Sequence, residues 1–180
     1  LLPAGAALAH TGLGATSGLI AGFVHPLEGL DHVLAMVTVG LWSGFALPQR
    51  FWAGAVTFMA AMSAGAGIGF LGGSLPFVEA GILASIVVFG LLTLFASPAQ
   101  ERGITLASLA AIAGFALFHG HAHAAEASGS ALLYVAGFLI STGPLHLAGI
   151  ELARLTSRHA AVARGLGAAV AISGVAMIVT

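Results

Sequence analysis

The chain has 180 residues, of which 59% are hydrophobic and only 6% are charged, with a formal net charge of −1. A soluble domain carries about 25% charged residues, so this composition excludes an ordinary soluble protein, and the charge balance gives no reason to expect nucleic acid as a partner. The absence of cysteine excludes disulfides and thiolate ligands, so a metal would need imidazole and carboxylate groups.

The first nine residues, "LLPAGAALA", have the features of the end of a signal peptide. This apolar stretch closes on an A-x-A pattern at residues 7–9, the usual form of a cleavage site. Cleavage there would make His10 the new N-terminus, and residues 10–180 would form a single transmembrane domain. The alternative is that residues 1–24 form one uncleaved apolar helix.

The rest of the chain consists of apolar runs separated by proline, glycine and charge. About 20 residues of helix cross the roughly 30 Å of hydrocarbon in a bilayer. The runs lack the period-2 alternation of a barrel, so we predict an all-α, polytopic membrane bundle of about six transmembrane helices after the N-terminal segment. The predicted spans are 26–47, 51–73, 77–96, 104–123, 132–152 and 160–179.

The basic residues predict the orientation of this bundle. All five are arginines, and with six alternating spans they fall on one side of the membrane. The positive-inside rule makes that side cytoplasmic, so both termini are expected to face outward. The arginines are Arg50, Arg102, Arg154, Arg158 and Arg164.

The stretch "HPLEGLDH", residues 25–32, places four ionisable groups at the start of the first span. Such residues inside a membrane are costly and indicate function. Pro26 suits the first turn of a helix, and on one helix all four groups can face the bundle interior. Two imidazoles with carboxylates suit a divalent transition metal, and Asp31 has a second role open to it, fixing the tautomer of a histidine. The alternative is a structural polar network. The four residues are His25, Glu28, Asp31 and His32.

A second cluster, "FHGHAHAAE" at residues 118–126, begins in the fourth span and continues just beyond its end. His119, His123 and Glu126 are spaced i, i+4, i+7 and share a helical face, while His121 points elsewhere. Histidines at i and i+4 form a metal-chelating pair. Because this span runs outward, the cluster is expected to lie level with residues 25–32, so that the two clusters meet. The alternative is a solvated histidine-rich loop.

A third group, His146 with Glu151, lies on the fifth span in the cytoplasmic half. His146 is either a packing residue or a ligand that extends an outer site into a path. None of the three groups matches a catalytic or nucleotide-binding motif, so we expect no enzymatic activity and no ATPase domain in this chain.

Two motifs in order on different spans give a resemblance to a known family. "HPLEGLDHVLAMVTVGLW" resembles the signature of the HupE/UreJ family of hydrogenase- and urease-accessory nickel permeases, with its H-x5-D-H core. "FHGHAHAAE" resembles the second motif of that family, F-H-G-x-A-H-G-x-E, and departs from it at Ala124, where the family has glycine. The motif residues that carry over are His25, Asp31, His32, His119, His123 and Glu126, while Glu28 stands at a variable position.

The resemblance implies uptake of Ni²⁺, or of Co²⁺ in some relatives, across the bacterial inner membrane for metalloenzyme maturation. The ion is cargo, and no prosthetic group is expected. The expected path begins with capture by His10, His123 and Glu126 at the outer mouth. It continues through a site of His25, Asp31, His32 and His119, and leaves past His146. The rival hypothesis is a membrane subunit for proton relay or assembly that uses the same residues without moving metal.

Overall fold

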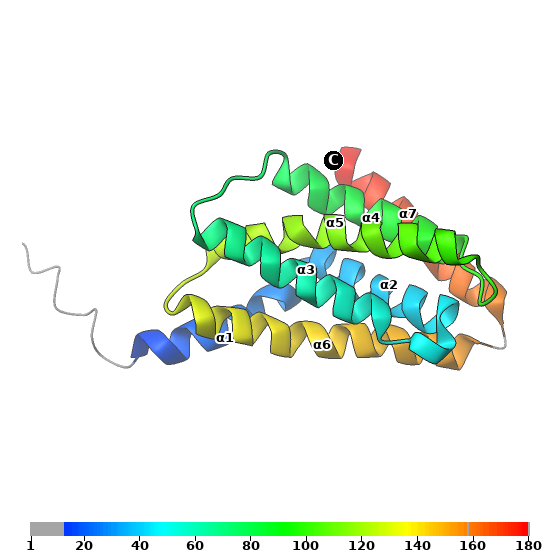
Figure 1. Ribbon diagram of the computed structural model, residues 1–180, viewed down its shortest axis with the longest axis horizontal. Helices are drawn as coiled ribbons and strands as arrows, with labels where there is room; N and C mark the ends of the chain where they lie inside the picture. The colour runs from blue at the N-terminus through cyan, green and yellow to red at the C-terminus, as the bar shows by residue number, and fades with distance from the viewer. Residues whose placement is uncertain (1–12, 158, 180) are drawn as a thin grey trace, which may run out of the picture.

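The computed structural model describes residues 13–157 and 159–179, with side chains from residue 18 onward. Every regular element in this range is a helix (Figure 1), which confirms the all-α prediction. The expected signal-peptide remnant at residues 1–9, His10 and Arg158 lie outside the described part of the chain. The elements are α1 (Leu13–Glu28), α2 (Leu30–Ala46), a short 3₁₀ helix η1 (Pro48–Arg50), α3 (Ala53–Phe70), α4 (Val78–Leu94), α5 (Arg102–Glu126), α6 (Ala131–Thr156) and α7 (Ala160–Val179).

The six predicted spans correspond to α2–α7. The length and apolar composition of the helices are those of a membrane protein. Four of them, α3, α5, α6 and α7, are long and apolar enough to cross a bilayer by themselves. Residues 18–46 of α1 and α2 pass the same test as a pair, bent by 80° at the break between them. The apolar helix α4 has 17 residues and is about 26 Å long, slightly less than the hydrocarbon thickness. Six crossings therefore remain a prediction.

The start of the first span differs from the expectation. Pro26 does not open that helix but lies inside the last turn of α1, which ends at Glu28. Gly29 then takes an extended backbone conformation, and α2 begins at Leu30 with Asp31 in its first turn. A carboxylate is favourable at this position because the N-terminal end of a helix carries partial positive charge. The residues of "HPLEGLDH" are thus divided between two helices.

The long helix α6 packs against both members of the bent pair. Glycines allow the close approach: a Cβ on Gly22 of α1 would overlap the backbone of Tyr134, and one on Gly40 of α2 would overlap the carbonyl of His146. The first half of α6 therefore lies on α1 and its second half on α2. This packing fixes both sides of the break against one continuous element.

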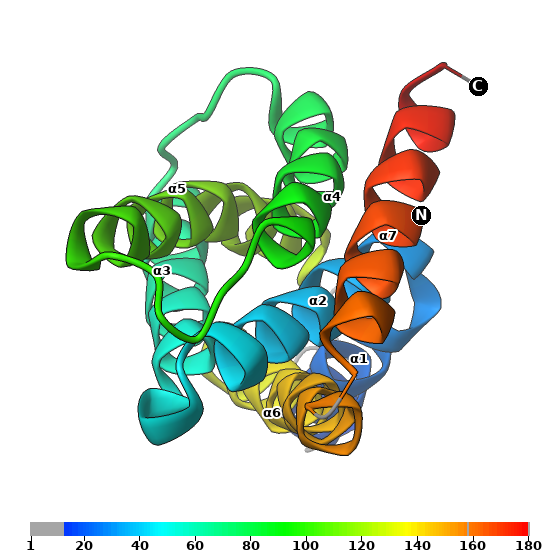
Figure 2. The ribbon, with the colours of Figure 1, turned by 90° about the vertical axis from the view of Figure 1, so that its right-hand side faces the viewer.

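The remaining helices surround α2. Figure 2 shows α3 and α5 on one side of it and α4 with α7 on the other, and these are also closely packed pairs. The connections after α2, α4 and α6 gather at one end of the molecule in Figure 1, and those after α3 and α5 at the other. The described arginines lie in η1, in the first turn of α5, in the last turns of α6 and early in α7, which agrees with the predicted segregation of charge.

Candidate metal site

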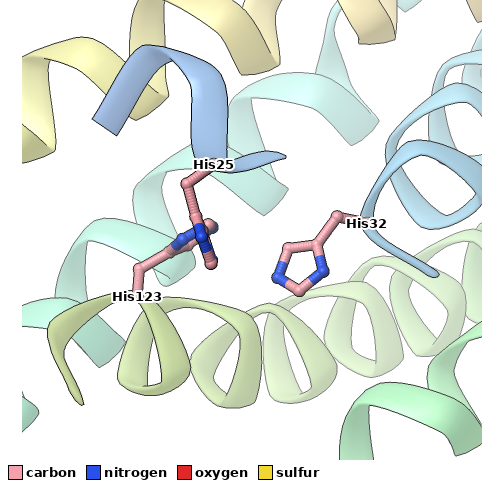
Figure 3. A group of neighbouring side chains, drawn as sticks. All are labelled: His25, His32 and His123. Carbon is pink, nitrogen blue, oxygen red and sulfur yellow. The ribbon is translucent and has the colours of Figure 1, made fainter. Parts of the chain in front are cut away.

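The break between α1 and α2 brings three imidazoles together. His25 at the end of α1 and His32 in the first turns of α2 face His123 of α5 (Figure 3), and one ring nitrogen from each lies within 4.8 Å of the others. The ring centroids of His25 and His123 are 4.7 Å apart, and those of His32 and His123 are 5.1 Å apart. We call His25, His32 and His123 the histidine trio.

Within the trio His32 and His123 are buried and His25 is partly exposed, and the three rings carry several nitrogen atoms without a partner among the described residues. His123 is fully buried and stacks on Phe138 of α6, with ring centroids 4.8 Å apart and planes inclined by 14°. Neither nitrogen of His123, nor Nε2 of His25 or His32, has a hydrogen-bond partner within the described chain. Buried polar atoms are nearly always bonded, so this concentration of free nitrogen atoms calls for a ligand.

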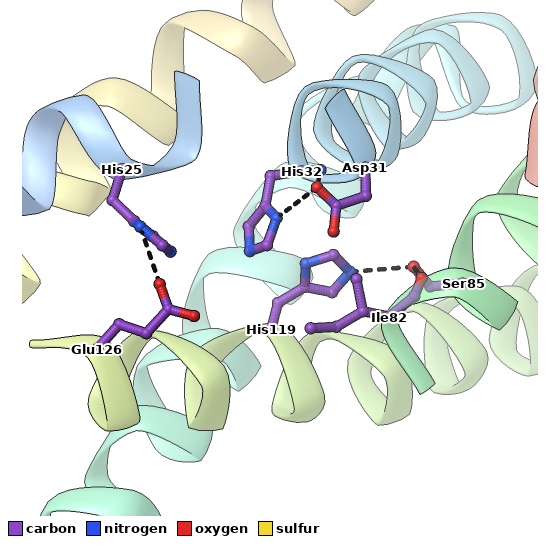
Figure 4. Close-up of polar contacts among 7 residues, drawn as sticks. All are labelled: His25, Asp31, His32, Ile82, Ser85, His119 and Glu126. Atoms are coloured by element: carbon purple, nitrogen blue, oxygen red, sulfur yellow. Dashed lines mark hydrogen bonds and ion pairs between the residues drawn. The ribbon is translucent and has the colours of Figure 1, made fainter. Parts of the chain in front are cut away.

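Two carboxylates orient the trio from outside it (Figure 4). Asp31 Oδ1 accepts hydrogen bonds from the backbone N–H of His32 at 2.9 Å and from His32 Nδ1 at 3.0 Å. Glu126 Oε2 lies 3.3 Å from Nδ1 of His25. Because an ionised carboxylate only accepts, Nδ1 of His32 carries a hydrogen, which leaves its lone pair on Nε2. Asp31 thus fixes the tautomer of His32 that directs a donor atom into the trio, while Glu126 places a carboxylate beside His25.

Two more histidines continue from the trio into the bundle. His119 is fully buried, its ring centroid lies 4.9 Å from that of His32, and its Nε2 is hydrogen-bonded to Ser85 of α4 at 3.0 Å. His146 of α6 donates from Nδ1 to the carbonyl oxygen of Thr142 at 2.9 Å. The ring of Phe58 packs against both of these histidines, with its centroid 5.4 Å from His119 and 5.1 Å from His146. Nδ1 of His119 and Nε2 of His146 are also buried, and neither has a hydrogen-bond partner in the described part of the chain.

The trio adjoins an open pocket of about 630 Å³ between α1, α6 and the end of α5, which we call the outer pocket because it opens to the surface of the bundle. His25 is the member of the trio that lines it, with 20% of its side chain exposed. The carboxylates of Glu28 and Glu126 and the ring of Tyr134 line it as well. The pocket therefore gives a cation access to His25 past two negative charges.

Most of the predicted site residues meet, but not in the expected order. His123 was expected at the outer mouth together with Glu126, and it lies instead among His25 and His32. Glu28 is exposed in the outer pocket, outside the trio. Its position follows from the end of α1, which leaves Glu28 on the other side of the Gly29 break from Asp31 and His32.

Comparisons with known proteins agree with the motifs on which the site is built. The family model described as HupE / UreJ protein matches residues 1–177. The chain belongs to the HupE/UreJ family. Protein HupE of Rhizobium leguminosarum bv. viciae is 42% identical over 95% of this chain and 89% of its own length. No solved structure matches significantly.

In this HupE/UreJ protein the two family motifs form opposite walls of one site. The first occupies the α1–α2 break and the second the last two turns of α5. His121 points out of the site, and its Nε2 hydrogen-bonds the carbonyl oxygen of Gly73 at 3.0 Å. Glu151 is paired with Arg154 and does not approach His146 through any described hydrogen bond or ion pair.

Sequence reasoning missed the residues that contact the histidines from other helices. Ser85, Phe58, Phe138 and Tyr134 each lie within an apolar run, where a single serine or aromatic residue is ordinary packing material. No spacing pattern distinguishes them, because their role depends on which helix each one faces. Only the packing of α3, α4 and α6 around the trio identifies them.

Proposed function

We propose that this protein takes up divalent transition-metal ions, nickel first and cobalt second, across the bacterial inner membrane. The observation that carries the proposal is the histidine trio: one ring nitrogen from each of three imidazoles lies within 4.8 Å of the others, and each ring has a buried nitrogen without a hydrogen-bond partner among the described residues. Imidazole is a ligand for nickel, and the soft thiolate ligands that select copper(I) are absent. Membership of the HupE/UreJ family, with its implied nickel cargo, supports the same ion.

The proposed route starts at the outer pocket on the periplasmic side. Glu28 and Glu126 attract the cation, and His25 passes it to His32 and His123. His119 and then His146 receive it further in, and the ring of Phe58, which packs against both, is the apolar barrier that delays passage. The arginine-bearing end of the bundle is the cytoplasmic end of this route.

Binding in the trio is expected to be moderate. Two nitrogen atoms bound to one ion are at most about 4.2 Å apart, because a metal–imidazole bond is about 2.1 Å long. The donors of the trio lie within 4.8 Å of one another, close to this limit, so small movements of the rings suffice to bind an ion and to release it. A permeation site must allow such release.

The membrane potential supplies a driving force. An inside-negative potential contributes about 2.3 kcal/mol per charge per 100 mV, hence roughly 4.6 kcal/mol for a dication. Entry of the ion therefore requires no ATP hydrolysis.

The test uses purified protein in liposomes that contain a nickel-sensitive dye, with an inside-negative potassium diffusion potential. Wild-type protein should accumulate nickel faster as the potential rises, and His32→Ala should reduce the rate to that of protein-free liposomes. His159→Ala is the matched control, since His159 is exposed in the α6–α7 connection. Equal uptake by wild type and His32→Ala would refute transport through the trio, and proton entry without nickel would replace it with a proton relay.

A further inference from the structure

Helix α4 contributes no ionisable residue to the site, yet it reaches the site through one buried hydroxyl. Ser85 is fully buried, and its Oγ lies 3.0 Å from Nε2 of His119. None of the family motifs quoted above includes Ser85.

The direction of this hydrogen bond follows from the other contact of the hydroxyl. Ser85 Oγ lies 2.6 Å from the carbonyl oxygen of Ile82, one turn earlier in α4 (Figure 4), and a carbonyl oxygen only accepts. A hydroxyl has one hydrogen, so Ser85 donates it to Ile82 and has only lone pairs to offer His119. The ring must therefore donate from Nε2, and a neutral His119 with its hydrogen there has its lone pair on Nδ1.

That lone pair is directed to the ion route. Nδ1 of His119 is buried and has no hydrogen-bond partner among the described residues. In Figure 4 it lies on the edge of the ring nearer to His32, opposite the edge bonded to Ser85, and the two rings are 4.9 Å apart at their centroids. The reverse tautomer would direct an N–H group at the route, and an N–H group cannot bind a metal cation.

We propose that Ser85 is a positioning residue that holds His119 in its Nε2–H tautomer, so that Nδ1 becomes the metal donor next after the trio. The metal-donor part rests on the proposed function, whereas the tautomer part does not. Ser85 thus does for His119 what Asp31 does for His32, but with a neutral group that adds no charge to retain the ion.

The first experiment is nitrogen NMR of metal-free protein with ¹⁵N-labelled histidine, in which His119 is assigned by the loss of its signals in His119→Asn. The expected result is the Nε2–H tautomer in wild type, a mixture of tautomers in Ser85→Ala, and restoration by Ser85→Thr, which keeps the hydroxyl. A merely structural role for Ser85 would not change the tautomer.

The matched control is Ser141→Ala. Ser141 of α6 is also buried and donates to a carbonyl one turn earlier, that of Phe138, but among the described residues it makes no hydrogen bond to a histidine. This variant should leave the tautomer of His119 unchanged. A wild-type Nδ1–H tautomer, or an unchanged Nε2–H tautomer in Ser85→Ala, would overturn the proposal.

The second experiment is calorimetric titration of the same proteins with nickel. Loss of a residue that orients a ligand typically weakens metal binding about 10-fold to 100-fold, and this loss is expected for Ser85→Ala but not for Ser141→Ala. Unchanged affinity in Ser85→Ala despite a changed tautomer would overturn the donor role of Nδ1. If wild type bound no nickel, the proposed function would fail, while the NMR result would still decide what Ser85 does.

Discussion

The two walls of the histidine trio are built in opposite ways. On α5, His119 and His123 are one turn apart in an unbroken helix of 25 residues, so helical periodicity alone puts them on one face. His25 and His32 belong to two helices that meet at 80°, and their rings come within 5.5 Å because the chain turns at Gly29. One wall depends on local geometry and the other on how α6 holds α1 and α2.

This difference separates residues that carry the ligands from residues that shape the backbone. On α5, substitutions that leave the helix intact should preserve nickel uptake, and only removal of a donor side chain should abolish it. At the break, nickel binding and uptake should also be lost when the backbone near Gly29 or the Asp31–His32 hydrogen bond is disturbed. The following substitutions test the contrast.

The largest effect is expected from His123→Ala, compared with His121→Ala two residues earlier on α5. His123 is fully buried in the trio, whereas His121 faces away and bonds the carbonyl oxygen of Gly73. Nickel uptake into liposomes should fall to background in the first variant and stay near wild type in the second. Equal loss in both would mean that the helix end matters as a whole, and not the donor atoms of His123.

The next effect comes from adding one methyl group at the break. A Cβ on Gly29 would lie 2.5 Å from Oδ1 of Asp31 and 3.0 Å from Nδ1 of His32, so Gly29→Ala must displace the carboxylate that orients His32. Nickel affinity measured by titration should fall about 10-fold, as expected for loss of an orienting partner, with the melting temperature nearly unchanged.

Gly120→Ala on α5 is the matched comparison. It should lower the melting temperature and leave nickel affinity unchanged, the opposite of Gly29→Ala. A Cβ there would overlap the backbone carbonyl of Met62 on α3, which cannot move aside as a side chain does. Overpacking of this kind costs about 1–3 kcal/mol, so thermal unfolding should occur at lower temperature while the folded fraction still binds nickel. A loss of affinity in both variants without loss of stability would contradict the contrast between the walls.

A smaller effect is expected for Glu126→Gln at the outer pocket. The Glu126 side chain is 57% exposed, and its partner His25 is 20% exposed, so water screens the charge. An exposed pair contributes up to about 1 kcal/mol, and the nickel concentration for half-maximal uptake should rise by at most about fivefold with an unchanged maximal rate. A reduced maximal rate would instead mean that Glu126 acts inside the trio.

The smallest effect is expected for Glu151→Gln at the other end of the bundle. Glu151 pairs with Arg154 on the exposed surface of α6, with both side chains at least half exposed. The free energy of unfolding should change by less than about 1 kcal/mol, and uptake should be unaffected. A strong loss of uptake would instead place Glu151 on the exit route next to His146, with which it shares the fifth predicted span.

Much of this protein was predictable from local sequence. The low charge and the 20-residue apolar runs determined a helical membrane bundle, because each run must satisfy its own backbone hydrogen bonds. The i, i+4, i+7 spacing on α5 determined a shared face for His119, His123 and Glu126. The two family motifs likewise identified His25, Asp31 and His32 as the opposite half of the site.

Only the tertiary structure decided how these halves combine. Helical periodicity predicts positions along one straight axis, so it could not show that α1 continues past Pro26 and turns at Gly29. That turn moves His25 and His32 to opposite sides of a break, groups them with the buried His123, and leaves Glu28 in the outer pocket. Ser85 and Phe58 reach His119 only through packing between helices, and such contacts between distant segments leave no local pattern in the sequence.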